Sequence, residues 1–118
     1  MSETRLVNLP VPDCLKVLHA AIVEGSVTGE LLDHYELTDA GGVLHCGVAV
    51  YEKYYYRVSN RLTLTVTVDD LMGKTRVHWI SAGGGESAFW RFDWGAADSF
   101  DSVVREALRP YFLEEGSN

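Results

Sequence analysis

The stretch RLTLTVTV, residues 61–68, has the clearest periodic pattern in the sequence. Leucine or valine alternates strictly with threonine from Leu62 to Val68, and a period of two is typical of a β-strand with one buried face. The opposite face carries only Thr63, Thr65 and Thr67, so it is polar or lightly covered. This combination predicts an antiparallel sheet with helices on one side.

Three shorter stretches around it are also predicted to be strands. Residues 30–39 have β character without a clean apolar face, and a glycine-containing turn follows them. Residues 75–81 place Val77 and Trp79 inward by alternation. Residues 87–94 are the candidate for a short last strand.

Residues 43–58, VLHCGVAVYEKYYYRV, are predicted to form one long strand. We assign its even positions, such as Val48 and Val50, to the buried face and its odd positions to the opposite face. Tyrosine and arginine are enriched in protein interfaces. The odd face therefore predicts a homodimer through an uncovered sheet surface that includes Tyr51, Lys53, Tyr55 and Arg57.

Two segments have helical periodicity. Residues 12–24 place apolar side chains on one stripe and end before Gly25, and residues 97–112 form a second amphipathic segment. The order predicts an α+β fold, in which an antiparallel meander of four or five strands has an N-terminal and a C-terminal helix packed on one face. We expect residues 1–118 to form a single domain with a frayed tail at 113–118.

The amino-acid composition limits the kinds of partner and the cellular compartment that we expect. Ten basic and seventeen acidic side chains give a formal charge of −7, so we expect neither nucleic acid nor a membrane surface as a partner. No stretch approaches the ~20 apolar residues of a membrane span, and no signal peptide is visible. We expect a cytoplasmic protein in which Cys14 and Cys46 are free thiols, and only geometry can exclude a disulfide between them.

Two motifs resemble cofactor-binding sites, but neither has the residues and spacing that such a site requires. Gly73-Lys74-Thr75 matches the end of a phosphate-binding loop, but Val68 stands where that motif requires glycine, and a strand follows it. The glycine triplet 83–85 lacks the spacing of a dinucleotide site. We predict no cofactor and no metal, because the four histidines lack metal-binding spacings, although sheet pairing could join two of them. The four histidines are His19, His34, His45 and His78.

Glu52 is the candidate for a functional acid. By alternation it shares the face of Val50 and Tyr54, where an unpaired carboxylate would be costly to desolvate. A β-bulge that turns Glu52 outward would explain it without a function, and so would an ion pair with Arg61 or Arg91.

The glycine triplet is the candidate for a ligand loop. Consecutive backbone N–H groups could form an anion-binding nest, whereas glycines also permit a tight turn between strands. The carboxylate of the next residue would compete with a bound anion, so the turn is the favoured interpretation. The candidate ligand site comprises Glu52, His78, Gly83, Gly84, Gly85, Glu86 and Arg91.

Four short phrases together resemble an uncharacterised family of small bacterial α+β proteins. They are EKYY at 52–55, SNR at 59–61, SAGGG at 81–85 and FDWGA at 92–96. The resemblance covers about half of the chain and implies a bacterial cytoplasmic protein with an antiparallel sheet and flanking helices. It implies no activity, so no catalytic residue follows from it.

The sequence therefore favours a non-catalytic cytoplasmic module that binds a small ligand or a protein partner, as a homodimer through its open sheet face. The alternative is a small enzyme whose site joins Glu52, the glycine loop at Gly83–Gly85 and His78.

Overall fold

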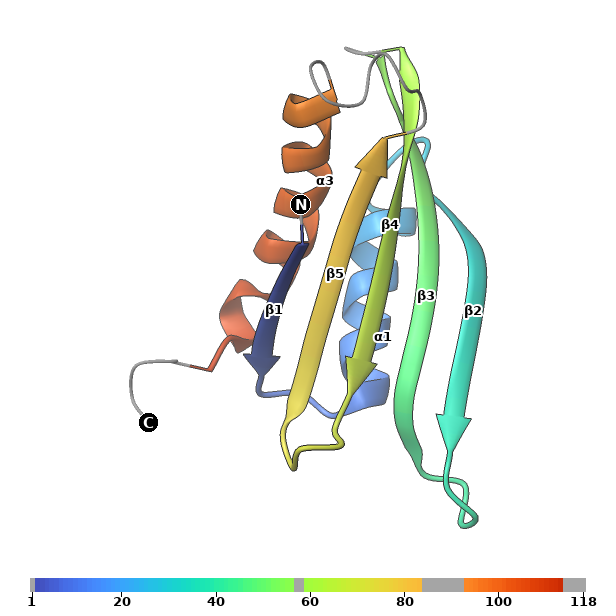
Figure 1. The fold of residues 1–118 in the computed structure, drawn as a ribbon, viewed down its shortest axis with the longest axis vertical. Coiled ribbons are helices and arrows are strands. Elements are labelled where there is room, and N and C mark those ends of the chain that lie inside the picture. The colour runs from blue at the N-terminus through green and yellow to red at the C-terminus, as the bar shows by residue number, and fades with distance from the viewer. Residues whose placement is uncertain (1, 57–58, 84–92, 114–118) are drawn as a thin grey trace.

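The computed structural model describes residues 2–56, 59–83 and 93–113, which form one antiparallel sheet with helices on a single face (Figure 1). The predicted α+β fold is confirmed, with five strands. The strands are β1 (Ser2–Val7), β2 (Glu30–Thr38), β3 (Leu44–Tyr55), β4 (Asn60–Asp69) and β5 (Thr75–Gly83). The helical elements are α1 (Val11–His19), the π-helical turn η1 (Ala20–Glu24), α3 (Asp93–Leu108) and the 3-10 turn η3 (Arg109–Tyr111).

The strand order is β1-β5-β4-β3-β2, and each neighbouring pair is antiparallel. Strands β2 to β5 form the predicted meander, whereas the sequence pattern does not predict β1. Only Val7 of β1 is fully buried, so this strand lacks the apolar alternation that would reveal it. Of the last strand expected at 87–94, residues 93 and 94 belong to α3 instead, and the rest lies outside the described residues.

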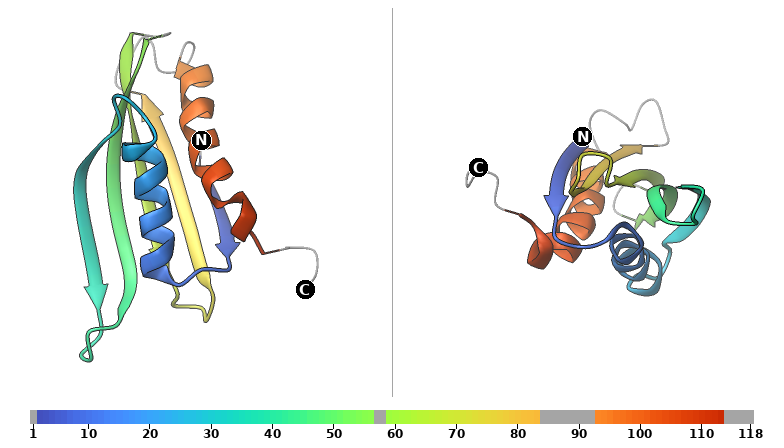
Figure 2. Two further views of the ribbon diagram at one scale, coloured as in Figure 1. Left: turned by 180° about the vertical axis from the view of Figure 1, so that it is seen from behind. Right: turned by 90° about the horizontal axis from the view of Figure 1, so that it is seen from below.

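Helices α1 and α3 pack beside each other on the same face of the sheet (Figure 2). The first covers β3 and β4, and the second covers β4 and β5. The expected helix at 12–24 is confirmed as α1 with η1. The second helix begins at Asp93 rather than at 97, and it ends at Leu108 because Pro110 cannot continue a regular helix.

Strands β4 and β5 have the faces that their alternation predicts. The leucines and valines of β4 are completely buried against the helices, as are Val77 and Trp79 of β5. Thr63, Thr65 and Thr67 lie half-buried on the opposite side, which no helix of the described chain covers. We call this side the open face.

The face assignment of β3 is wrong. Gly47, Ala49 and Tyr51 are buried on the helix side, so Val48 and Val50 lie on the open face. The reason is that both faces of β3 carry apolar and aromatic residues, so its alternation has no unique phase. The odd positions have the small residues that a closely packed helix requires.

A chain of polar contacts joins α3 to the sheet. The indole N–H of Trp79 donates to the carboxylate of Asp101, which is 5% exposed and also pairs with Arg105. The Arg105 guanidinium lies 2.6 Å from Glu3 Oε1 on β1. Burial alone would raise the pKa of Glu3, but hydrogen bonds from Arg105 and Arg5 lower it. These polar contacts fix the packing of α3 against β5 and β1.

Both cysteines are free, as predicted. Cys14 lies on α1 and belongs to the buried core, and its burial raises the pKa of its thiol to about 12. Cys46 lies opposite Asp69 on β4 and opposite Leu37 on β2, which places it on the open face. Because the sheet separates the two side chains, they cannot form a disulfide with each other.

Candidate functional site

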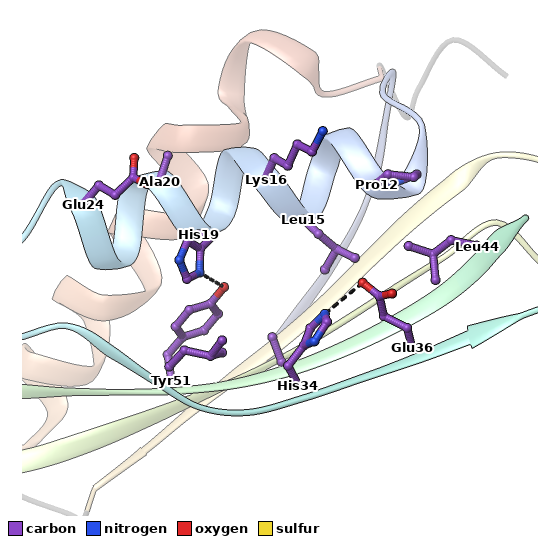
Figure 3. A pocket seen from close by; sticks show the side chains of 12 residues that line it. Pro12, Leu15, Lys16, His19, Ala20, Glu24, His34, Glu36, Leu44 and Tyr51 are labelled. Carbon is purple, nitrogen blue, oxygen red and sulfur yellow. Dashed lines mark hydrogen bonds and ion pairs between the residues drawn. The ribbon is translucent and has the colours of Figure 1, made fainter.

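A groove of ligand size lies on the helix side of the sheet, between α1 and the β2–β3 hairpin (Figure 3). Its volume is about 550 Å³, within the roughly 300–1,000 Å³ that small-molecule sites occupy. Helix α1 with η1 forms one wall, β2 forms the other, and β3 forms the floor. The apolar part of its lining consists of Pro12, Leu15, Ala20, Leu31, Leu44 and Ala49.

The groove arises because α1 packs on β3 and not on β2. A Cβ atom on Gly47 would lie 2.5 Å from Cδ1 of Leu15, so a larger residue here would force the Leu15 side chain of α1 to move. Next to it, Ala49 adds only a methyl group to the floor. Every residue of β2 is exposed, so this strand extends beyond the cover of the helix and leaves the space open on one side.

His19 and Tyr51 meet at one end of the groove. The Nδ1 atom of His19 lies 3.3 Å from the Tyr51 hydroxyl oxygen, and the two rings are tilted with centroids 6.0 Å apart. Burial raises the pKa of Tyr51 to about 12. The phenol therefore keeps its proton at neutral pH and can donate or accept a hydrogen bond.

His34 and Glu36 supply the polar groups of the β2 wall. They lie two positions apart on the side of β2 that faces α1, with His34 Nε2 2.9 Å from Glu36 Oε2. Lys16 and Glu24 lie on the exposed side of the opposite wall. The groove therefore combines an apolar floor with hydrogen-bonding groups at its margins.

The sequence did not identify this site. His19 and His34 were noted only as histidines without metal spacing, and the groove depends on the position of α1 over Gly47 and Ala49. A signal was nevertheless present, because Gly47 and Ala49 interrupt a strand of otherwise large residues. Small residues at alternate positions of a strand indicate the close approach of another element.

The structure places Glu52 and His78 on the open face but does not bring them together. Glu52 lies opposite Thr63 on β4, and Thr63 lies opposite Ala82 on β5, four positions from His78. This arrangement separates the two side chains by roughly 13 Å along the strands and roughly 10 Å across them.

Each of these two side chains has another partner. Arg61 donates a hydrogen bond to Glu52 at 3.1 Å, which confirms the ion-pair interpretation of this acid. His78 Nδ1 lies 2.7 Å from the Thr4 hydroxyl of β1. Gly83 ends β5 opposite Leu62, whereas Gly84, Gly85, Glu86 and Arg91 lie outside the described residues.

The four residues predicted for a dimer interface do not share the open face. Tyr51 is 3% exposed in the core, and Tyr55 packs on Phe100 of α3 with ring centroids 5.8 Å apart. The Lys53 ammonium lies 5.2 Å from the centroid of the Tyr55 ring. Arg57 lies outside the described residues. The prediction that Tyr51, Lys53 and Tyr55 lie on the open face is therefore wrong, because the faces of β3 are reversed.

His45 forms a second polar cluster, at the far end of the sheet. Its Nδ1 lies 2.9 Å from Asp70 Oδ1 and its Nε2 lies 2.9 Å from Asp39 Oδ2, and these hydrogen bonds raise the pKa of His45. It thus fastens the β2–β3 turn to the β4–β5 turn and does not meet His78. Among the described residues, no group of three or more metal-ligating side chains is suited to hold a metal ion.

Comparisons with known proteins place the chain in a family without giving it an activity. No curated protein and no solved structure matches it significantly. Among the described residues, no helix is long and apolar enough to cross a membrane. A protein-family model covers residues 2–112, which is nearly the whole chain. The chain therefore belongs to DUF6054, a family of unknown function, in agreement with the resemblance of its sequence phrases.

Proposed function

We propose that this protein is a non-catalytic binding module of the bacterial cytoplasm, and that it holds a small, mainly apolar molecule in the groove between α1 and β2. The groove carries the proposal, because it combines a volume of about 550 Å³ with an apolar floor and a few convergent polar groups. Sites of this composition are where proteins most often bind small molecules.

The lining favours a ligand with an apolar body and one oxygen acceptor. Leu15, Leu31 and Leu44 offer apolar surface on all three sides of the groove. The Tyr51 hydroxyl stays protonated at neutral pH because burial raises its pKa to about 12, so it can donate to a carbonyl or carboxylate oxygen. Lys16 supplies a cation at the rim for an acidic group.

Binding without catalysis is supported by the pairing of the titratable groups. His19 is engaged with Tyr51, and His34 with Glu36, so neither imidazole is presented alone to the groove. The enzyme alternative has less support, because Glu52 is paired with Arg61 and lies far from His78.

The proposal is tested by filling the groove. Ala20 lines it and is exposed, so Ala20→Phe should occupy its space without disturbing the core. Native mass spectrometry would detect any molecule that the purified protein retains, and anilinonaphthalene sulfonate fluorescence would report an apolar site. We expect Ala20→Phe to lose both signals and Val27→Phe, at a position 96% exposed, to keep them. Equal binding by the two variants would overturn the proposal.

The compartment and the assembly state are proposed together with this function. Two free cysteines, one of them in the core, are consistent with the reducing cytoplasm. A homodimer is supported by large exposed apolar side chains on β2, among which Tyr35 is 61% and Leu32 49% exposed.

A further inference from the structure

The outer edge of β2 is uncovered. All nine residues of this strand are exposed, and within the described chain β2 pairs only with β3. Figure 1 shows β2 as the outermost strand, and Figure 2 shows both helices over other strands. The backbone N–H and C=O groups along its outer side therefore face solvent, which makes β2 a template for another strand.

The side chains of β2 discourage such pairing only through three carboxylates, at Glu30, Asp33 and Glu36. The strand contains neither proline nor lysine, the residues that most often protect an exposed edge. Instead it exposes four large apolar side chains, which are Leu31, Leu32, Tyr35 and Leu37. This apolar content favours contact with a second apolar strand.

The regular part of β2 is centred on Tyr35. The register with β3 shifts between Leu31 and Asp33 and again between Leu37 and Thr38. The continuous segment therefore runs from Asp33 to Leu37, and Tyr35 is its middle residue. Tyr35 lies opposite Val48 on β3, which places it on the open face.

The charges of this segment also select Tyr35 as the centre. An antiparallel pairing about a two-fold axis at Tyr35 places His34 of each copy opposite Glu36 of the other. An axis at Glu36 would oppose two carboxylates, and an axis at His34 would oppose two imidazoles. A glutamate can accept a hydrogen bond from a histidine opposite it, whereas two carboxylates opposite each other repel, so the axis at Tyr35 is favoured.

From these observations we infer that a second copy of this chain pairs with β2 edge to edge and antiparallel, with the two-fold axis at Tyr35. The two sheets become one continuous sheet, and the helices of both copies lie on the same side of it. On the open face the two Tyr35 rings lie side by side, and each Leu37 lies opposite Asp33 of the other copy.

The Tyr35 substitution tests this dimer without altering the proposed ligand site. Tyr35 lies on the open face, whereas the groove is on the helix side, so a substitution at Tyr35 leaves the groove lining unchanged. Loss of the dimer and loss of ligand binding can therefore be observed separately.

Sedimentation velocity over a wide range of protein concentration tests the inference. We expect the wild-type protein to dimerise, and Tyr35→Lys to raise the dissociation constant by about tenfold or more, because two ammonium groups would meet at the axis. Ile80→Lys is the matched control, since Ile80 is an exposed apolar residue of the open face on β5, and we expect its dimer to be unchanged.

A charge exchange tests the register. His34→Glu alone opposes two carboxylates and should weaken the dimer, and combining it with Glu36→Lys should restore it. Circular dichroism would verify that each variant is folded. A wild-type protein that stays monomeric at every concentration would overturn the inference. So would a dimer that Ile80→Lys dissociates and Tyr35→Lys does not, because the open face would then be the interface.

Discussion

The two edge strands of the sheet, β1 and β2, differ in whether other parts of the described chain cover them. At the end of β1, the segment that follows α3 lies against residues 6–8 and pairs with their backbone groups. Its contacts are hydrogen bonds from Asn8 N–H to Tyr111 O (2.7 Å) and from Leu113 N–H to Leu6 O (3.0 Å), and a bridge between Val7 and Phe112. Along β2, the described chain provides no such cover.

The difference shows where the protein has surface to use. The β1 edge is held further by Arg5, whose guanidinium lies 4.0 Å from the centroid of the Phe112 ring, and by the pair of Glu3 with Arg105. The β2 edge forms a wall of the groove and has a free outer side. We therefore expect binding and assembly at β2, and mainly structural roles at β1.

Removing the cover of β1 should have the largest effect. A chain that ends at Pro110 loses Tyr111 and Phe112, which pack partly buried against the core. We expect the free energy of unfolding to fall by roughly 2–3 kcal/mol from the lost apolar burial. Urea denaturation measures this change, and a chain that ends at Leu113 is the control. Equal stability of the two shortened chains would show that the β1 edge does not need its cover.

The second largest effect is expected from a substitution that disrupts the close approach of α1 to β3. Gly47→Ala would place a methyl group 2.5 Å from Leu15 Cδ1, so Leu15 has to move. We expect a loss of roughly 1–2 kcal/mol from overpacking, measured by urea denaturation. In a Leu15→Ala background the loss should be largely relieved. Gly41→Ala is the control, because the nearest atom to its Cβ would lie at an ordinary 3.5 Å.

The His45 cluster at the end of β2 predicts a smaller, pH-dependent effect. Hydrogen bonds to Asp39 and Asp70 raise the pKa of His45 above its unfolded value of about 6.5. The protonated imidazole therefore stabilises the fold fully below the unfolded pKa, and this contribution is lost as the pH rises through the folded pKa. Thermal unfolding from mildly acidic to mildly alkaline pH should show a declining melting temperature.

The substitution His45→Gln should reduce that decline, since glutamine does not titrate. His78→Gln provides a matched control, because His78 contacts a threonine hydroxyl and not a carboxylate. A slope that is the same in His45→Gln and in the wild type would exclude His45 as its source.

The Glu52 ion pair should have the smallest effect. The side chains of Glu52 and Arg61 are 24% and 52% exposed, and exposed pairs of this kind contribute little. We expect Glu52→Gln to change the free energy of unfolding by about 0.5 kcal/mol or less. A larger gain in stability would identify Glu52 as a residue kept for a function on the open face.

The sequence correctly predicted the faces of the strands that have one apolar face, and it failed at β3 and β1, which lack a single apolar face. Strands β4 and β5 were assigned correctly because each has one apolar face and one polar face, so the phase of the alternation is unique. β3 has apolar residues on both faces, which is why its phase was reversed. The edge strand β1 has a single fully buried residue and therefore gave no periodic signal.

The candidate groove could not be predicted by pattern. Its polar residues, His19, His34, Glu36 and Tyr51, come from three elements and meet only because α1 lies over β3 and leaves β2 uncovered. The distance between a helix and a strand depends on small residues such as Gly47, whose meaning is clear only once the packing partner is known. The Glu52 pair with Arg61 was foreseen, because the two residues lie at short range across one hairpin.

The position of β1 also orders events during synthesis. Among the described strands β1 is synthesised first, yet it pairs with β5, which is synthesised last, so Ser2 can pair with Ile80 only after the others have been made. The β2–β3 hairpin can form from neighbouring residues long before this, since local pairings close shorter loops. The segment around Phe112 follows every described strand, so the nascent protein passes through a stage in which both edges of its sheet are open to other strands.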